Sequence, residues 1–151
     1  MDNEINIEGF SDYDKKEVLD LLNGAELPIE DHTSQKMKNF MVARHKDGSI
    51  IGVVGVEMYQ GSGLLRSLVI HPSYRGKGLG SRLTRKIESY AWQNGIKTLY
   101  LLTMTAADFF PKIGYEITQR DKVPESIVKT EEFKNVCPVS AVCLFKVLDI
   151  A

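Results

Sequence analysis

Hydrophobic and polar positions change their spacing several times along the chain, and each spacing predicts a different element. Alternation around Ile5 and Ile7 indicates a short strand. Ser11, with Asp14 three residues later, is typical of a helix N-cap, and Gly24 ends the helix predicted after it. The apolar face of that helix consists of Val18, Leu21 and Leu22. Residues 26–36 keep no period, which predicts a loop or a short second helix.

The next part of the chain predicts a meander of three strands. Residues 40–45 read as the first strand, and Asp47-Gly48 supplies a hairpin turn. Residues 50–59 follow as a long run whose alternate positions are both apolar, which indicates a strand buried on both faces. After a turn at residues 61–63, residues 64–70 return as a third strand that stops at His71-Pro72.

The period then changes to that of a helix. Apolar residues recur every three or four positions at Leu79, Leu83, Ile87, Tyr90 and Ala91. Gly95 fits the stop of this helix. Beyond it we expect a strand over 98–103, a short helix over 106–113 closed by Gly114, a strand starting at 115–118 and a last strand over 139–147. This order predicts a single mixed α/β domain over residues 1–151, with helices on both faces of the sheet.

Composition and charge exclude several classes of function. The 19 basic and 20 acidic residues leave a net charge of -1, so no global field attracts nucleic acid. No apolar run approaches a membrane span, and the acidic N-terminus is unlike a secretory signal, which predicts a cytoplasmic protein. Cys137 and Cys143 lack the spacing of a zinc site, so we expect no metal and free thiols.

The strongest chemical signal lies where the third meander strand passes into the long helix. Residues 75–80 read RGKGLG. Glycines let backbone N–H groups converge, and a helix N-terminus adds partial positive charge, so this junction suits a phosphate. The spacing fits neither a dinucleotide fingerprint nor a P-loop. The alternative is a flexible glycine turn with solvated charges.

These residues resemble the signature Q/R-x-x-G-x-G/A of the GNAT superfamily of acyl-CoA-dependent N-acyltransferases, matched by Arg75, Gly78 and Gly80 after the segment LVIHPSY. The resemblance implies a mostly antiparallel sheet of six to seven strands and acetyl-CoA as the cosubstrate. It also implies that the amides of residues 76–81 bind the pyrophosphate and that the backbone of residues 68–70 pairs with the pantetheine arm. The implied cosubstrate-binding residues are Leu68, Val69, Ile70, Arg75, Gly76, Lys77, Gly78, Leu79, Gly80 and Ser81.

Glu57 is the candidate general base, because it is the one carboxylate in the apolar run IIGVVGVEMY. A base is useful because only the neutral amine attacks a thioester. The alternative is a carboxylate near the strand end that meets solvent or an arginine. Arg66 shares a strand face with Leu68 and suits a substrate carboxylate, while a salt bridge from Arg66 to Glu57 is the competing interpretation.

The general acid is left open. Many GNAT members have a tyrosine in a segment resembling A-x-x-L-Y-x-K-x-G-F, but the aligned residue here is Phe110, which cannot donate a proton. A thiolate is already a tolerable leaving group, because a thiol pKa is about 8.5. Tyr115, Cys143 and water are the candidate substitutes.

The C-terminal strings T-x-EF and CPxSA are similar to a GNAT subgroup associated with arsenic resistance, whose relatives include phosphinothricin acetyltransferases. That similarity implies an amino-acid-like small-molecule amine as the acceptor, acetylated by direct attack in a ternary complex. The alternatives are acetylation of a protein N-terminus or lysine, and a non-catalytic acyl-CoA sensor. Cys137 and Cys143 suggest arsenic binding, although packing is the more ordinary role of such cysteines. A homodimer is left open.

Overall fold

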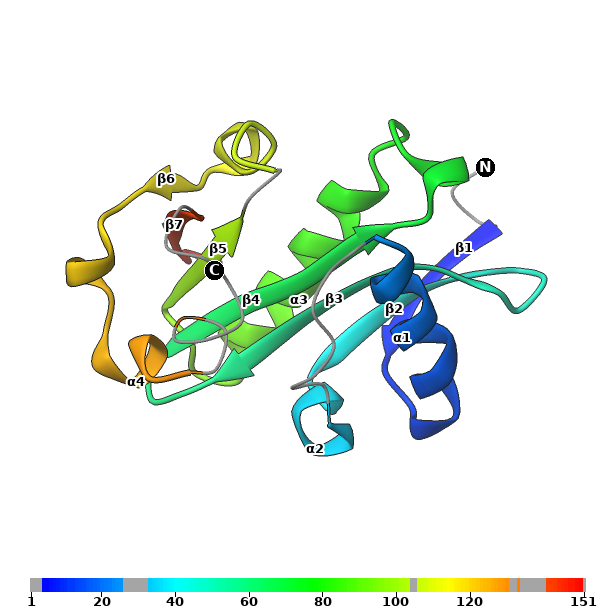
Figure 1. The fold of residues 1–151 in the computed structure, drawn as a ribbon, viewed down its shortest axis with the longest axis horizontal. Helices are drawn as coiled ribbons and strands as arrows, with labels where there is room; N and C mark the ends of the chain where they lie inside the picture. Colours follow the sequence, from blue (N-terminus) through cyan, green and yellow to red (C-terminus); the bar gives the residue numbers. More distant parts are fainter. Residues whose placement is uncertain (1–3, 26–32, 104–105, 131–132, 134–140, 151) are drawn as a thin grey trace. The chain divides into compact units, whose positions relative to one another are not determined.

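A computed structural model describes residues 4–25, 33–103, 106–130, 133 and 141–150 of the chain (Figure 1). Seven strands form one mixed, mostly antiparallel sheet in the order β1-β2-β3-β4-β5-β7-β6. The strands are β1 (Ile5–Gly9), β2 (Phe40–His45), β3 (Ile50–Met58), β4 (Ser62–Ile70), β5 (Thr98–Thr103), β6 (Glu116–Ile117) and β7 (Val142–Val147). The α-helices are α1 (Lys15–Gly24), α2 (Ser34–Met37), α3 (Leu79–Gln93) and α4 (Glu125–Val128).

The chain divides into two compact units that alternate along the sequence. The first unit comprises residues 1–56 and 67–87, and the second comprises residues 57–66 and 88–151. Strands β3 and β4 and helix α3 each begin in one unit and end in the other. The assignment of residues 1–151 to a single domain stays a prediction.

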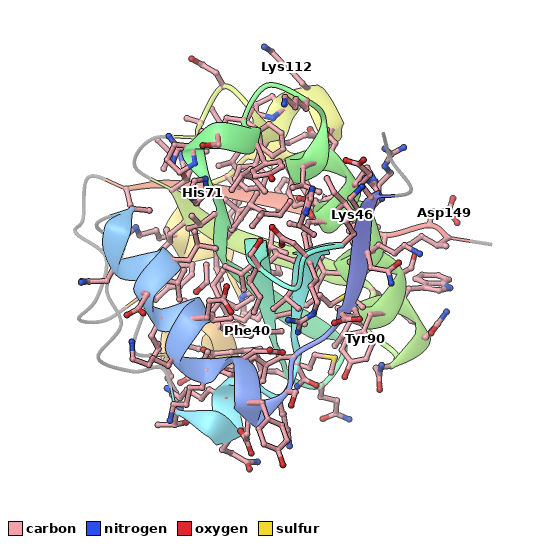
Figure 2. The ribbon with its side chains drawn as sticks, turned by 90° about the vertical axis from the view of Figure 1, so that its right-hand side faces the viewer. Phe40, Lys46, His71, Tyr90, Lys112 and Asp149 are labelled. Carbon is pink, nitrogen blue, oxygen red and sulfur yellow. The ribbon has the colours of Figure 1, made fainter. Side chains whose placement is uncertain are left out.

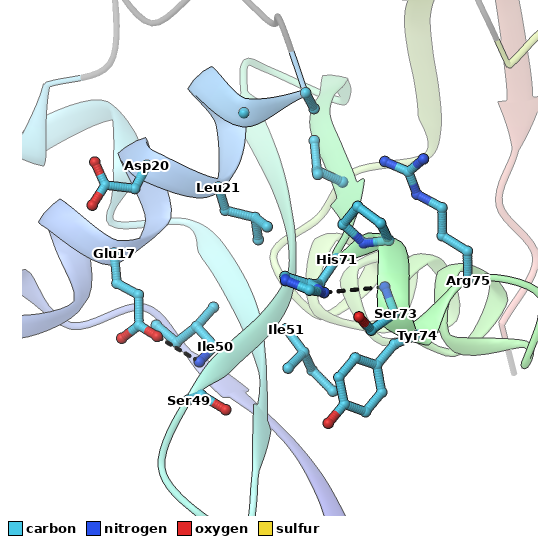
Figure 3. Close-up of a pocket in the computed structure, with 14 residues that line it drawn as sticks. Glu17, Asp20, Leu21, Ser49, Ile50, Ile51, His71, Ser73, Tyr74 and Arg75 are labelled. Atoms are coloured by element: carbon cyan, nitrogen blue, oxygen red, sulfur yellow. Dashed lines mark hydrogen bonds between the residues drawn. The ribbon is translucent and has the colours of Figure 1, made fainter.

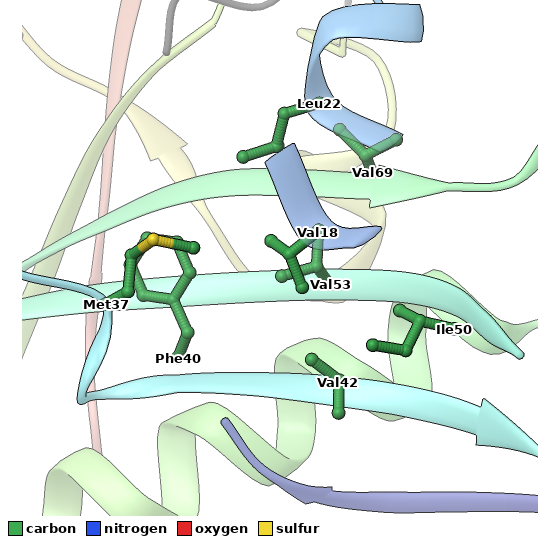
Figure 4. Close-up of a cluster of buried hydrophobic side chains, with 8 residues drawn as sticks. All are labelled: Val18, Leu22, Met37, Phe40, Val42, Ile50, Val53 and Val69. Carbon is green, nitrogen blue, oxygen red and sulfur yellow. The ribbon is translucent and has the colours of Figure 1, made fainter. Parts of the chain in front are cut away.

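The core of the first unit lies between α1 and the strands β2 and β3 (Figure 4). Val18 and Leu22, which are one turn of α1 apart, are fully buried against it. Helix α2 and the strands β2, β3 and β4 contribute the other buried members, which are Met37, Phe40, Val42, Ile50, Val53 and Val69. Burying a side chain of this size stabilises the fold by about 1.5–3 kcal/mol, so this cluster accounts for the apolar face predicted for α1.

Small residues on β2 and β3 determine how closely other groups approach the first unit's strands. Gly55 pairs with Phe40 across the two strands, and the Phe40 ring covers the space that a Cβ at Gly55 would need. On the opposite face Gly52 pairs with Ala43. A Cβ at Gly52 would lie 2.9 Å from Cδ1 of Leu83 on α3. Helices therefore cover both faces of these strands, as predicted.

The N-cap predicted at Ser11 is present. The Ser11 Oγ accepts the N–H of Tyr13, and the Asp14 carboxylate accepts the N–H of Ser11. The first turn is a 3-10 turn over Asp12–Asp14, and α1 follows it. The buried Asp14 also accepts a 2.8 Å hydrogen bond from Arg44 on β2. In the turn after β2, Lys46 lies beside β1 and pairs with Glu4 at 3.1 Å (Figure 2).

The second unit is built around β5. The first residues of β4 pair with β5 in parallel over Ser62–Leu64, and β7 pairs with β5 antiparallel along its whole length. Strand β6 adds two residues to the other edge of β7. A second apolar cluster packs here, with Tyr59 and Tyr100 half-buried against it. Its buried members are Leu64, Leu102, Val123, Ile127, Phe133, Ala141 and Cys143.

Most of the predicted elements are confirmed, and the differences have local causes. Strands β2 and β5 match the predicted ranges 40–45 and 98–103. The predicted helix over 106–113 was wrong in type, because only Phe110–Ile113 is helical and its turn is 3-10. Pro111 has no N–H for an α-helical hydrogen bond, and the segment is too short to compensate. Helix α4 was not predicted, and residues 139–140 of the predicted last strand lie outside the described residues.

We expect Gly55→Ala to lower the free energy of unfolding by about 2 kcal/mol or more, because the new Cβ overlaps the Phe40 ring in a packed core. Urea unfolding followed by circular dichroism measures this change. Gly24→Ala is the matched control, since no heavy atom lies within 4 Å of its Cβ position. The control should gain about 0.5 kcal/mol, and equal effects in the two variants would contradict the packing argument.

Candidate donor loop and buried charge pair

A tight turn positions the candidate donor loop, which we define as residues 75–81. Strand β4 ends at Ile70, and the N–H of His71 still bonds to the carbonyl of Ile51 at 2.7 Å. The next residues form a 3-10 turn over Pro72–Tyr74, and Nδ1 of His71 accepts the N–H of Ser73 at 3.1 Å. His71 therefore caps the turn.

The glycines of the donor loop adopt conformations that side chains rarely take. Gly76 has φ +77° and Gly78 has φ +83°, and no heavy atom lies within 4 Å of either Cβ position. Arg82 donates its N–H to the carbonyl of Gly78 at 3.1 Å, which begins the hydrogen-bonded ladder of α3. The amides of residues 79–81 precede that ladder and lie at the positive end of the helix. This geometry fits a pyrophosphate group.

The side chains of the donor loop divide into an anchor and exposed charges. Leu79 is 3% exposed and fixes the start of α3 in the first unit. Arg75 and Lys77 are exposed. The Arg75 Nε donates to the carbonyl of Ile70 at 3.0 Å, and the Lys77 Nζ lies 5.6 Å from the centre of the Tyr74 ring. Both cations are thus held near the loop, where they add positive charge for an anion.

Strand β4 contains an irregularity just before the predicted pantetheine-binding residues. Ser67 has φ +62°, a left-handed conformation that is uncommon for a residue other than glycine. Beyond it Leu68 and Ile70 are half-buried, while Val69 is buried in the cluster under α1. This conformation could not be predicted from the sequence, because serine does not mark left-handed backbone as glycine does.

A cavity of about 640 Å³ adjoins the donor loop in the first unit (Figure 3). Residues of α1, the start of β3, the end of β4 and residues 71–75 line it. Val69 and Arg75 are the predicted cosubstrate residues among its walls. Glu17 accepts the N–H of Ile50 at 2.8 Å and so ties α1 to β3 at the cavity wall. The approach of α1 to residues 71–75 was not predicted from the sequence.

The second unit contains a buried charge pair made by Glu57 and Arg66. Glu57 is 9% exposed and Arg66 is 6% exposed. The Arg66 Nη1 donates to Oε2 of Glu57, and the Tyr59 hydroxyl donates to Oε1 of Glu57 at 2.8 Å. The arginine partner considered for Glu57 is therefore present, and the guanidinium offsets the cost of burying the carboxylate. Tyr59 was missed in the sequence, although it stands two residues after Glu57.

A second buried carboxylate in this unit, Glu88, explains the role of Tyr115. The Tyr115 hydroxyl donates to Glu88 at 2.8 Å, and the Lys146 Nζ contacts both Glu88 oxygens at 3.1 and 3.2 Å. Burial, followed by the Glu88 charge and hydrogen bond, raises the pKa of Tyr115 far above its ordinary value. Tyr115 is thus poorly suited to the role of general acid. Phe110 is buried against the Tyr115 ring.

Cys143 belongs to the apolar cluster of the second unit. Its thiol is free, and burial raises its pKa to about 11. These properties match a packing residue and make the thiol a weak nucleophile near neutral pH. Cys137 lies outside the described residues. Among the residues that the structure describes, no group of His, Cys, Asp and Glu side chains could hold a metal ion, and no helix is long and apolar enough to cross a membrane.

The left-handed glycine turn at the start of α3 has the backbone geometry expected of an anion-binding loop at the end of a strand. Residues 36–117, more than half of the 151, match the family model of the acetyltransferase (GNAT) domain. The chain belongs to this family. The predicted superfamily is thereby confirmed, while the finer arsenic-resistance subgroup stays a prediction.

Similar proteins agree with this family. An uncharacterized N-acetyltransferase of Chlorobaculum tepidum is 29% identical over 94 residues, covering 62% of this chain and 59% of its own length. An amino-acid acetyltransferase of Pseudomonas syringae is 37% identical over 73 residues, covering 48% of this chain and 17% of its own length. N-acetylglutamate synthase of Neisseria gonorrhoeae, solved with coenzyme A and N-acetyl-glutamate, shares the fold with a TM-score of 0.83 at 21% identity. That match covers 97% of this chain and 35% of the synthase.

The Glu88 network generates a stability prediction. Lys146→Met removes the charge that faces the buried Glu88 carboxylate, so we expect the free energy of unfolding to fall by about 2 kcal/mol. Denaturant unfolding measures the loss. The double variant Lys146→Met with Glu88→Leu should recover most of it, because no unpaired charge is left. A double variant as unstable as the single one would show that charge pairing is not the cause.

Proposed function

We propose that this chain transfers the acetyl group of acetyl-CoA to the primary amine of a small, amino-acid-like molecule. The observation that carries the proposal is the left-handed Gly76–Gly78 backbone at the N-terminus of α3, in a chain that belongs to the acetyltransferase (GNAT) family. The names of the relatives support an amino acid as the acceptor, since one of them is an amino-acid acetyltransferase. The reaction is a direct attack of the amine within a ternary complex.

The donor loop binds the pyrophosphate of acetyl-CoA in this proposal. The amides of residues 76–81 donate hydrogen bonds to the phosphate oxygens, and Arg75 and Lys77 add positive charge around them. The backbone of Leu68, Val69 and Ile70 pairs with the pantetheine amides in the manner of an added strand. When bound, the thioester of acetyl-CoA supplies the activated acetyl group.

Glu57 acts as the general base, and Arg66 binds the carboxylate of the acceptor. The lone pair of a neutral amine forms the new N–C bond while the C–S bond breaks, and the surplus amine proton passes to Glu57. Each oxygen of a carboxylate has a second acceptor site, so the bonds from Arg66 and Tyr59 leave Glu57 able to take this proton. The Arg66 guanidinium carries a positive charge and presents its N–H groups in a planar fork, which suits a substrate carboxylate.

The departing thiolate needs no strong acid. The ordinary thiol pKa of about 8.5 makes the thiolate a tolerable leaving group. Phe110 cannot donate a proton, and the proton of Tyr115 is held by Glu88. Solvent water therefore protonates the thiolate in this mechanism. The same two residues favour the second candidate function, a non-catalytic acyl-CoA sensor, in which CoA binds but no acceptor reacts.

The narrower acceptor class is that of the arsenic-resistance and phosphinothricin acetyltransferase subgroup. This assignment depends on the strings T-x-EF and CPxSA, much of which lies at residues 131–140 outside the described part of the chain.

Incubation of the pure protein with acetyl-CoA and a panel of amino acids and amino-acid analogues, with detection of free thiol, tests the catalytic proposal. Stabilisation by CoA without turnover of any acceptor would favour the sensor.

Gly78→Ala should weaken CoA binding at least tenfold, because alanine at φ +83° disturbs the donor loop. Isothermal titration calorimetry with CoA measures the affinity. Gly61→Ala is the matched control, since Gly61 has φ +79° and equally open space but lies in the β3–β4 turn. Both variants should lose similar stability. Retention of wild-type CoA affinity by Gly78→Ala would contradict the proposed role of the donor loop.

Glu57→Gln should lower kcat/KM most near neutral pH and less at alkaline pH, because more of the acceptor amine is then already neutral. The measurement is a pH profile of kcat/KM between pH 6 and about 10 for an acceptor identified by the panel. Glu116→Gln, which removes an exposed carboxylate on β6, is the control. A profile of Glu57→Gln with the wild-type shape would exclude Glu57 as the base.

A further inference from the structure

We propose that Tyr59 is a positioning residue that holds Glu57 in place and stabilises its ionised form through the Tyr59 hydroxyl. This inference rests on the proposed function, in which Glu57 is the base. Its direct support is the 2.8 Å hydrogen bond from the Tyr59 hydroxyl to Oε1 of Glu57. Arg66 bonds to the other carboxylate oxygen, so the two donors together fix the plane of the carboxylate.

Tyr59 is held at both ends, which makes it suitable for this role. Its backbone N–H bonds to the carbonyl of Ser62 at 2.8 Å, which closes the turn between β3 and β4. Its ring packs against the apolar cluster of the second unit. A hydroxyl carried by such a ring loses little freedom when it bonds to Glu57, so the hydrogen bond costs little entropy.

The Tyr59 hydroxyl acts as a donor throughout the working pH range. Burial, followed by the hydrogen bond and charge of Glu57, raises the pKa of Tyr59 well above its ordinary value of 10, and Arg66 opposes this only in part. The phenol therefore keeps its proton while Glu57 is ionised. A hydrogen bond to a charged acceptor is among the stronger ones in proteins, so its loss favours protonation of Glu57.

The other ionisable groups of this cluster keep one state between about pH 4 and 8. Burial raises the pKa of the Cys143 thiol to about 11, and it also raises the pKa of Tyr100. Arg120, whose guanidinium lies 5.8 Å from the Phe133 ring, stays charged. None of these three groups contributes a signal at a glutamate side-chain carboxyl, so they do not interfere with the observation of Glu57.

The test compares Tyr59→Phe with Tyr100→Phe, since both tyrosines are half-buried against the same cluster. Carbon-13 NMR of protein labelled at the glutamate side-chain carboxyl follows the titration of Glu57, which Glu57→Gln assigns. We expect Tyr59→Phe to raise the titration midpoint of Glu57 by about one pH unit or more. Tyr100→Phe should leave it unchanged. In wild-type protein labelled at tyrosine Cζ, the Tyr59 signal should move as Glu57 takes up a proton.

The kinetic counterpart separates this inference from the proposed function. With an acceptor that the enzyme acetylates, Tyr59→Phe should lower kcat/KM about tenfold at pH values below the raised Glu57 midpoint. At higher pH, kcat/KM should recover. The positioning role is overturned if the Glu57 midpoint is unchanged in Tyr59→Phe. It is also overturned if the Tyr59 signal does not shift when Glu57 takes up a proton. The NMR titration needs no acceptor. A raised midpoint without turnover of any acceptor therefore supports the Tyr59–Glu57 coupling and overturns the acetyl-transfer proposal.

Discussion

A buried carboxylate has to be paired, and this constraint determines the chemistry of the β3–β4 hairpin. Glu57 follows seven buried residues of β3, where an isolated charge would be too costly to keep. Arg66 meets it from β4, and Tyr59 meets it from the turn. Arg66 is itself buried, so each charge depends on the other. In the proposed mechanism the base and the carboxylate-binding group are consequently coupled, and a change in either alters the electrostatics of both.

The Glu88 network obeys the same rule for a structural purpose. Its carboxylate is as deeply buried as that of Glu57, and it has a tyrosine and a cation as partners as well. Lys146 also bonds to the carbonyl of Ile113 and so fixes the segment before Gly114. This group therefore has a structural role, whereas a catalytic role is proposed for the Glu57 group.

Local patterns were enough to predict most elements, because a strand or helix depends on spacing that is visible within ten residues. The limits of β2 and β5 and the cap at Ser11 followed from such patterns. The helix predicted before Gly114 was wrong in type, because the apolar spacing of that segment suits an α-helix while Pro111 prevents one. The donor loop was predictable because glycine reports backbone geometry directly. The conformation of Ser67 and the contact of Tyr59 could not be predicted, since the first depends on the path of β4 and the second on the closure of the β3–β4 turn.

The close helix–sheet contact in the first unit has a consequence for the donor loop. Leu83 sits over Gly52 and Ala43, and it lies one turn into the helix whose first residues belong to the loop. The size of two residues on β2 and β3 thereby sets the height of the loop above the sheet. The affinity for acetyl-CoA then depends on the size of these strand residues as well as on the sequence of the loop. Substitutions far from the phosphates are therefore expected to change it.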